Sequence, residues 1–187
     1  MQDDFIKRYR GNRMKKLDEY VRTVPDFPEP GVMFRDITSV LQDPDGLHMA
    51  INEMQDLVKD IDFDVVVGAE SRGFIFGTAI AYNLHKGFVM VRKKGKLPWD
   101  TIEESYDLEY GKAVVEMHKD SIKPSQKVLI VDDLIATGGT IKAMCKLIER
   151  LGGEVVGVLT MMELKGLKGR EAIAPYKLYA ALSYEGK

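Results

Sequence analysis

Hydrophobic and polar residues along this chain form blocks of two kinds, short apolar runs and longer stretches with helical spacing. The apolar runs are rich in β-branched residues, which is typical of buried strands, and they lie at 64–68, 88–91, 127–131 and 154–160. Helical spacing begins at Asp43-Pro44 and recurs at 74–84 and from about 140 to 151. Because strands and helices alternate, the pattern predicts an α/β fold with a central, mostly parallel sheet flanked by helices.

Three segments depart from this alternation. Residues 3–23 predict a helix of uncertain start, whereas 24–36 contain three prolines and a glycine and predict a non-helical loop. Residues 92–112 begin with lysines, Gly95 and Pro98 and continue as an alternating stretch, which predicts a long loop and an excursion from the core. Long loops in compact domains are usually functional or disordered.

Composition indicates a single globular domain. With 187 residues, 45% of them hydrophobic, the chain can bury a proper core, and we expect one domain over 1–187. Its single cysteine, Cys145, excludes an internal disulfide framework and suits a reducing cytoplasm; the helical pattern around it predicts a buried position. No apolar run approaches the roughly 20 residues that span a bilayer, and the charged N-terminus does not resemble a secretory signal.

Charge does not favour a nucleic-acid or membrane partner, because the formal net charge is −2. Basic residues cluster near the N-terminus, but a solvated helix face or arm explains so short a segment better than a nucleic-acid contact; they are Lys7, Arg8, Arg10, Arg13, Lys15, Lys16 and Arg22. The histidines, His48, His85 and His118, are dispersed and match no metal spacing, so we expect them to be structural or surface residues.

The most informative segment is VLIVDDLIATGGT, residues 128–140. An apolar strand ends at Asp132-Asp133, and ligands of parallel α/β sheets bind beyond the carboxyl ends of the strands. Two adjacent carboxylates are tolerable there if they accept hydrogen bonds from ligand hydroxyls or lie near a cation. The small residues that follow begin a helix, where free N–H groups favour a phosphate. One strand, turn and helix therefore offer carboxylates for a sugar diol and an amide cradle for its phosphate.

An ordinary strand-to-helix turn, with glycines for geometry and a threonine cap, explains such a short pattern about as well. The motifs of P-loop NTPases and of dinucleotide-binding enzymes are both missing from the sequence. The full segment, however, closely resembles the signature with which type I phosphoribosyltransferases bind 5-phosphoribosyl-1-pyrophosphate (PRPP), and its Asp-Asp and Ala-Thr-Gly-Gly-Thr are similar to the adenine branch.

This resemblance extends from about residue 20 to 184 and implies the type I phosphoribosyltransferase fold, with a small N-terminal hood and a mobile catalytic loop. Residues 1–36 would supply the N-terminal helix and base-binding loop, and 37–187 the PRPP-binding core. The implied reaction transfers the phosphoribosyl group of PRPP to adenine, giving AMP and pyrophosphate in purine salvage. A cytoplasmic homodimer without nucleic-acid or membrane partners is implied as well.

By the resemblance, Asp132 and Asp133 hold the ribose hydroxyls, and the phosphate is cradled by Ala136, Thr137, Gly138, Gly139 and Thr140. In the segment 23–36, Phe34 would stack on the base while the backbones of Met33 and Arg35 bind its edge; without the resemblance, Phe34 would be taken for a core aromatic. The segment 68–74 resembles the pyrophosphate loop. It contains Glu70, Ser71 and a catalytic Arg72, and its Glu70–Ser71 peptide is implied to be cis.

The segments 91–98 and 104–111 resemble the catalytic loop and the strand after it. Glu109 matches the catalytic carboxylate, Tyr110 the tyrosine beside it, and Arg92 an arginine that reaches the PRPP site across the dimer. Lys96, with Lys93 and Lys94, would draw in a polyanion, although a solvated loop explains at least one of these lysines. Trp99 stands where the family usually has glycine, which puts the kinetics of loop closure in question. Mg²⁺ is expected through PRPP and water rather than through protein ligands.

Two other functions remain open from the residues. A phosphoribosyltransferase for 6-oxopurines would share the PRPP segments, but the loop with Phe34 favours adenine. A PRPP-sensing regulatory protein would need an added nucleic-acid-binding domain or a strongly basic face, which the net charge of −2 does not favour.

Overall fold

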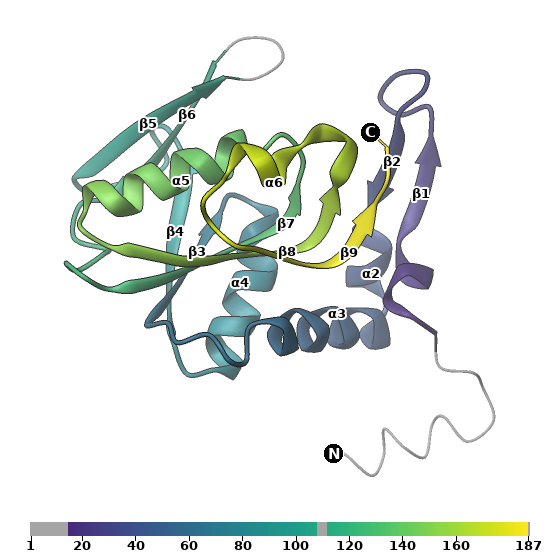
Figure 1. The fold of residues 1–187 in the computed structure, drawn as a ribbon, viewed down its shortest axis with the longest axis horizontal. Helices are drawn as coiled ribbons and strands as arrows, with labels where there is room; N and C mark the ends of the chain where they lie inside the picture. Colours follow the sequence, from purple (N-terminus) through teal and green to yellow (C-terminus); the bar gives the residue numbers. More distant parts are fainter. Residues whose placement is uncertain (1–14, 108–111, 187) are drawn as a thin grey trace. The chain divides into compact units, whose positions relative to one another are not determined.

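A computed structural model describes residues 15–107 and 112–186 of the chain (Figure 1). The chain divides into two compact units, Met1–Met49 and Ala50–Lys187, which are described separately. Helix α3, Pro44–Leu57, contains the boundary between them and begins where the sequence predicts.

The first unit is built around a β-hairpin. A 3₁₀ helix, η1 at Leu17–Tyr20, leads into β1, Arg22–Pro25, which pairs antiparallel with β2, Met33–Asp36. The short helix α2, Thr38–Gln42, follows. Of the predicted helix over 3–23, the described residues form only the 3₁₀ turn at Leu17–Tyr20, and the prediction is wrong at Arg22 and Thr23, which belong to β1; residues 1–14 lie outside the described part. Two β-branched residues before Pro25 favour extended backbone, and pairing with β2 holds it there.

The second unit contains a seven-stranded sheet with the order β5-β6-β4-β3-β7-β8-β9. The five strands from β4 to β9 in this order run parallel, whereas β6 is antiparallel to both β4 and β5. The predicted α/β class with a mostly parallel sheet is therefore confirmed. The elements are β3 (Val65–Ala69), α4 (Arg72–Asn83), β4 (Gly87–Lys93), β5 (Thr101–Asp107), β6 (Lys112–His118), β7 (Lys127–Ile135), α5 (Gly139–Arg150), β8 (Glu154–Leu164), η2 (Lys165–Leu167), α6 (Gly169–Ala172) and β9 (Leu178–Tyr184).

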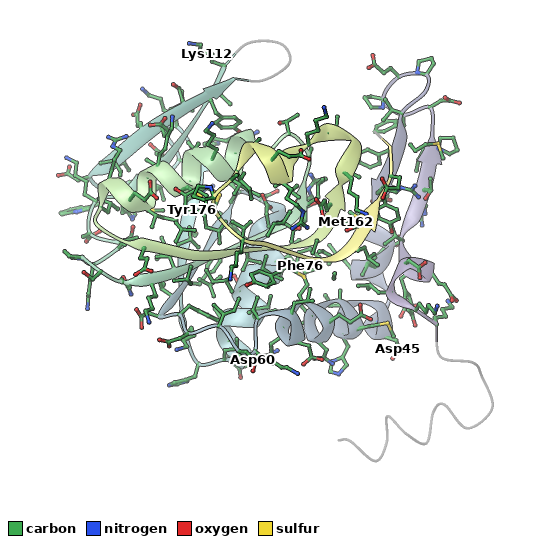
Figure 2. All side chains as sticks on the ribbon, in the orientation of Figure 1. Asp45, Asp60, Phe76, Lys112, Met162 and Tyr176 are labelled. Carbon is green, nitrogen blue, oxygen red and sulfur yellow. The ribbon has the colours of Figure 1, made fainter. Side chains whose placement is uncertain are left out.

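Helices cover both faces of this sheet, with α4 on one face and α5 on the other (Figure 1). Val65 and Val67 of β3 belong to the core cluster that includes Met144 and Leu147 of α5. Because side chains alternate along a strand, Val66 faces the opposite side, where Phe76 of α4 is fully buried (Figure 2). Burial on both faces explains why the parallel strands are continuous apolar runs rather than alternating ones.

The predicted loop followed by an alternating stretch agrees with the described part of 92–112, where residues 94–100 form a loop and β5 follows; the loop is shorter than expected, because Arg92 and Lys93 still belong to β4. Ile102, Glu104 and Tyr106 are half-buried, whereas Glu103 and Ser105 between them are exposed. This period of two is the signature of a strand with one solvent face. In the part of the chain that the structure describes, no helix is long and apolar enough to cross a membrane.

Candidate functional site

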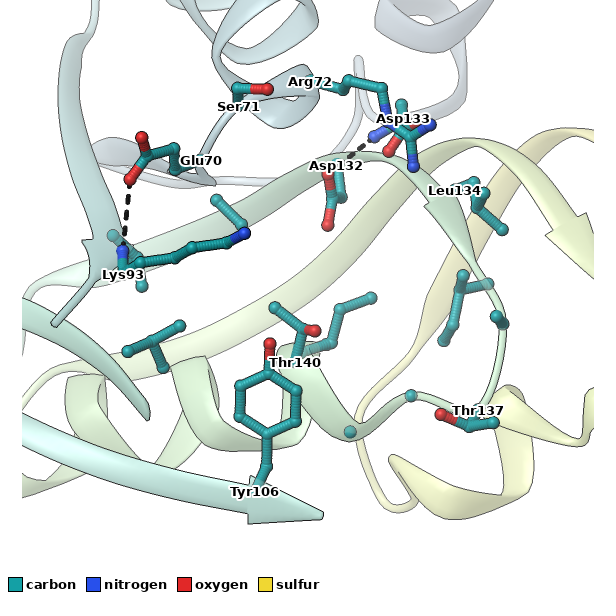
Figure 3. A pocket seen from close by; sticks show the side chains of 18 of the residues that line it. Glu70, Ser71, Arg72, Lys93, Tyr106, Asp132, Asp133, Leu134, Thr137 and Thr140 are labelled. Carbon is teal, nitrogen blue, oxygen red and sulfur yellow. Dashed lines mark hydrogen bonds and ion pairs between the residues drawn. The ribbon is translucent and has the colours of Figure 1, made fainter. Parts of the chain in front are cut away.

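A cavity of about 250 Å³ opens at the carboxyl ends of β3 and β7 (Figure 3). It is lined by residues 69–72, 91–93 and 132–141, together with Tyr106 and Val115. The cavity therefore brings together three segments that the sequence analysis selected separately, because neighbouring parallel strands end at one edge of the sheet.

Two adjacent carboxylates lie at the centre of this site. Asp133 is buried and Asp132 half-buried, and the Asp133 amide donates a 2.9 Å hydrogen bond to Asp132 Oδ1. Desolvation raises the pKa of Asp132 well above its ordinary value, and the charge of Asp133 adds to this effect. Desolvation also raises the pKa of Asp133, although the nearby Arg72 opposes it. The site therefore disfavours two isolated negative charges and suits ligand hydroxyls or a cation beside them.

The loop Ala136–Gly138 joins β7 to α5 and lines the same cavity. Gly138 precedes the helix in the left-handed region, at φ +81°, which a glycine adopts without steric cost. The first turn of α5 contains Gly139 and Thr140, and Thr137 lies in the loop before it. Backbone N–H groups at a helix start, with two hydroxyls beside them, form a chemically suitable cradle for a phosphate.

The loop after β3 supplies the opposite wall. The Glu70–Ser71 peptide is cis, as the resemblance implied. Arg72 begins α4, and its Nε lies 2.8 Å from Asp133 Oδ2. This contact is an ion pair rather than a directed hydrogen bond, since that oxygen accepts no hydrogen bond from the described residues. Half of the Arg72 side chain remains exposed, so its guanidinium is accessible to an anionic ligand.

Arg92 of β4 is connected to the loop after β3 by an ion pair with Glu70. Its Nε and Nη2 donate to the two carboxylate oxygens of Glu70 at 3.3 and 3.1 Å, and Nη1 donates to the Lys96 carbonyl at 3.1 Å. The pKa of Glu70 is lowered by its hydrogen bond from Arg92, against an opposing effect of desolvation. Arg92 thus lines the cavity of its own chain and pairs there with Glu70.

Glu116 of β6 is a buried carboxylate that the sequence analysis did not select. It accepts hydrogen bonds of 2.8 Å from the amides of both Lys96 and Leu97, so it fixes the turn after β4. Desolvation raises its pKa, but the backbone donors outweigh this and leave the pKa lowered. Of the three lysines in this segment, Lys93 lines the cavity, whereas Lys94 pairs with Glu103 of β5 at 2.8 Å.

Tyr106 also lines the cavity without having been selected, and Figure 3 shows its ring directed toward Thr140. The period of two over 101–107 was the signal that could have placed it on an inward face. The strand is attached to α5, because Glu104 accepts from Lys146 at 2.7 Å and lies 3.4 Å from Arg150 Nη1. The same arginine donates to the Glu103 carbonyl at 2.7 Å.

The residues expected to bind a base lie on β2 in the first unit. The Phe34 ring is half-buried and meets Phe27 edge-on, with centroids 5.1 Å apart. Pro25, which pairs with Met33, has no N–H, so this is the non-hydrogen-bonded kind of antiparallel pair. Backbone groups alternate along a ladder, and those of Met33 and Arg35 therefore point away from β1.

Some predictions lie elsewhere or outside the described residues. Glu109 and Tyr110 fall in 108–111, which the structure does not describe. Cys145 is buried as predicted, and desolvation raises the pKa of its thiol to about 12. Trp99 is exposed, in the turn before β5.

Comparison with known proteins agrees with this geometry. Residues 38–180 match the phosphoribosyl transferase domain family. The chain is 64% identical over 174 residues to the adenine phosphoribosyltransferase of Lachnoclostridium phytofermentans, which covers 93% of this chain and 100% of that protein. The crystal structure of adenine phosphoribosyltransferase from Thermoanaerobacter pseudethanolicus is 43% identical with a TM-score of 0.87, covering 90% and 100% of the two chains.

The Saccharomyces cerevisiae adenine phosphoribosyltransferase, solved with D-2,5-dideoxy-2,5-imino-altritol 1,6-bisphosphate and adenine, is 35% identical. Its TM-score is 0.83, and the match covers 89% of this chain and 96% of that one.

Proposed function

This chain belongs to the adenine phosphoribosyltransferase family, and from that premise we propose that it transfers the 5-phosphoribosyl group of PRPP to adenine, giving AMP and pyrophosphate. The observation that carries the proposal is the single cavity that unites Asp132-Asp133, the loop Ala136–Gly138 and Arg72. Relatives named for adenine, together with β2, favour this base over 6-oxopurines and an enzyme over a regulatory protein.

PRPP has three chemically distinct parts, and the cavity offers a partner for each. The 5-phosphate binds the N–H groups and hydroxyls of residues 136–140. The ribose hydroxyls donate to Asp132 and Asp133, which offsets the desolvation that raises the pKa values of both carboxyl groups. The pyrophosphate lies against Arg72 and the Glu70–Ser71 loop, with Arg92 and Lys96 nearby. A planar guanidinium suits the oxygens of such a leaving group.

Adenine is bound by β2. A purine needs an aromatic platform, which Phe34 supplies, and its edge can be recognised by backbone groups of fixed geometry. The outward-directed backbones of Met33 and Arg35 provide such groups. The yeast relative crystallised with adenine supports the choice of base.

The reaction forms a bond from a ring nitrogen of adenine to C1 of the ribose and breaks the bond from C1 to pyrophosphate. Positive charge develops on the sugar, and Asp132 and Asp133 stabilise it, while Arg72 stabilises the leaving group. Glu109, with Tyr110 beside it, accepts the proton that the attacking nitrogen loses. Closure of the catalytic loop that the resemblance implies excludes the water that would otherwise hydrolyse PRPP.

Mg²⁺ fits this site as a companion of the substrate. The carboxylates of Asp132 and Asp133 are the oxygen donors that Mg²⁺ and its waters prefer, and a cation relieves their mutual repulsion. When bound together with PRPP, the ion would neutralise charge on the pyrophosphate. The protein residues meanwhile bind and orient the two organic substrates.

The enzyme acts as a cytoplasmic homodimer without nucleic-acid or membrane partners. Support for a dimer comes from α4, where Ile75 and Tyr82 are seven residues apart and exposed, with Tyr82 at 84%. Met90 on β4 is exposed as well. The unpaired thiol of Cys145 suits a reducing compartment. Sedimentation of wild type and Tyr82→Glu tests the dimer, which the charged variant should weaken.

The test of the function is nucleotide formation from PRPP, Mg²⁺ and adenine, hypoxanthine or guanine. AMP from adenine alone is expected. If IMP or GMP were the main product, the assignment of the PRPP site would stand but the assignment of adenine as the base would be wrong. PRPP binding without any product would indicate a regulatory protein.

A further inference from the structure

The segment Gly169–Ile173 lies directly behind the loop Ala136–Gly138, which is called the phosphate loop below. None of the residues of this segment lines the cavity. A Cβ atom added to Gly138 would lie 2.9 Å from the Gly169 carbonyl oxygen and 3.0 Å from Ile173 Cγ2. In the other direction, a Cβ on Gly169 would lie 2.3 Å from the Ala136 carbonyl oxygen and 2.7 Å from Ile135 Cγ1. The two backbones therefore approach so closely that neither position has room for a side chain.

An ion pair anchors this segment to the sheet at the same level. Arg170 donates to both oxygens of Glu163, at 2.9 and 2.6 Å, and to the Leu178 carbonyl at 2.9 Å. Glu163 is 3% exposed and stands on β8 in register with Ile135, the last residue of β7 before the phosphate loop. On its other side it is in register with Ser183 of β9, whose hydroxyl donates to it at 3.3 Å.

These contacts have a common geometrical result. The Arg170–Glu163 pair fixes α6 against β8 and β9, and α6 in turn presents Gly169 to the Ala136 carbonyl. Hydrogen bonds of the first turn of α6, from Ala172 to the Lys168 carbonyl and from Ile173 to that of Gly169, hold the segment as one piece. The phosphate loop therefore has β7 and α5 at its two ends and α6 along its back.

We propose that Gly169 and the Arg170–Glu163 ion pair are positioning residues for the loop Ala136–Gly138 and set the affinity of the site for a sugar 5-phosphate. This rests on the proposed function, which assigns the loop to that phosphate. Amide groups of a cradle stabilise a phosphate only when several point at it together, so a shift of a few tenths of an ångström weakens binding without removing any contact residue.

Titration calorimetry with ribose 5-phosphate and, separately, with pyrophosphate tests the proposal. For Gly169→Ala we expect about tenfold weaker binding of ribose 5-phosphate and unchanged binding of pyrophosphate, which uses the Arg72 wall. In turnover, KM for PRPP should rise while KM for adenine stays constant. Arg170→Gln should also weaken the binding of ribose 5-phosphate. Arg170→Lys keeps a positive charge opposite the Glu163 carboxylate and should therefore recover part of the lost affinity.

Gly153→Ala is the matched control. Its Cβ would lie 2.6 Å from Ile122 Cγ2 and 2.8 Å from Ile148 Cγ2, a steric clash with side chains just beyond the opposite end of α5. This variant should lose thermal stability but bind ribose 5-phosphate like wild type. If Gly169→Ala fails to fold, the Arg170 pair of variants decides the question alone.

The outcomes separate the inference from the function beneath it. Wild-type affinity for ribose 5-phosphate in both Gly169→Ala and Arg170→Gln would overturn the positioning role. Equal loss of ribose 5-phosphate and pyrophosphate binding would do the same, because it would mean general damage to the fold. Failure of the wild-type protein to bind ribose 5-phosphate would instead overturn the phosphate assignment of the loop, and the inference with it.

Discussion

Arg72 Nε lies 2.8 Å from Asp133 Oδ2, and this ion pair joins the start of α4 to the end of β7. Asp133 therefore already faces a cation, whereas its neighbour Asp132 is directed into the cavity (Figure 3). The two carboxylates are consecutive in sequence but differ in what they face. We expect their replacement to have different effects on the protein without substrate.

Replacing Asp132 with asparagine should stabilise the protein and weaken PRPP binding. The pKa of Asp132 is raised by desolvation, so the folded protein holds this proton more tightly than the unfolded chain does. Stability is then lost as the pH rises from the ordinary value of 3.8 through the raised one. At neutral pH, Asp132→Asn should unfold about 2–4 °C higher than wild type, the change that about 1 kcal/mol produces in a chain of this size.

Thermal unfolding between pH 4 and 8 measures this difference, which should grow with pH. Carboxylates away from the site contribute equally to both proteins, so the difference reports Asp132 together with its interaction with Asp133. A difference that does not vary with pH would contradict the assignment. Asp62→Asn, which removes an exposed partner of Lys127, is the control and should leave PRPP affinity unchanged.

Glu116→Ala should lower both stability and turnover. The buried carboxylate accepts from the amides of Lys96 and Leu97, and its loss should cost about 2–3 kcal/mol in the free energy of unfolding. The released turn also holds Arg92 through the Lys96 carbonyl, so kcat/KM for PRPP should fall. Denaturant unfolding and initial rates measure the two effects.

The pH dependence has the opposite sign from that of Asp132. The pKa of Glu116 is lowered, so its contribution is present above the ordinary value of 4.5 and is lost as the pH falls through the lowered one. The gap between wild type and Glu116→Ala should therefore close in acid. Glu116→Gln keeps a side-chain oxygen as acceptor and should have a smaller effect; an effect as large as that of alanine would point to the charge alone.

Much of the fold could be predicted because the parallel strands are buried on both faces. Val65–Val67 and Val128–Val131 read as continuous apolar runs, and the end of the second run marks the site. The strand β5 could be predicted only as an alternating stretch after a loop, because its one inward face alternates with exposed residues, a weaker pattern than a continuous run. Its antiparallel pairing with β6 and its place at the edge of the sheet were not predicted.

The residues that hold the site residues in position could not be predicted from the sequence. Glu116 and Glu163 resemble any other acid in the sequence, and only the folded sheet shows that each is buried and bonded. The helix prediction failed at Arg22 and Thr23 for a related reason, since pairing of β1 with β2 outweighs the local helical spacing there. Motif residues could be selected because their spacing is local, whereas residues that hold them depend on distant parts of the chain.

Phe34→Ala should weaken adenine binding without affecting PRPP. Loss of one base–aromatic stack costs about 1–3 kcal/mol, which corresponds to a rise in the KM for adenine of about 5- to 150-fold. Phe34→Tyr keeps the platform and serves as the matched control. Phe27→Ala removes only the edge contact to Phe34 and should have an intermediate effect. Initial rates at saturating PRPP measure this; an unchanged KM in Phe34→Ala would exclude the stacking role.

Glu109→Gln should lower kcat by about 10²- to 10⁴-fold, the usual contribution of a positioned general base. PRPP binding, measured by calorimetry, should remain as in wild type because the pyrophosphate and phosphate partners are unchanged. Glu103→Gln is the control, because Glu103 is exposed and pairs with Lys94. Full turnover in Glu109→Gln would remove the proton-handling role.

Helix α5 begins at the phosphate loop and, nearer its other end, holds β5 through Lys146 and Arg150. This helix therefore connects the loop proposed to bind a phosphate with the strand that leads to residue 109. A substitution that displaces the start of α5 is expected to disturb β5 as well, so these two parts of the chain share one support.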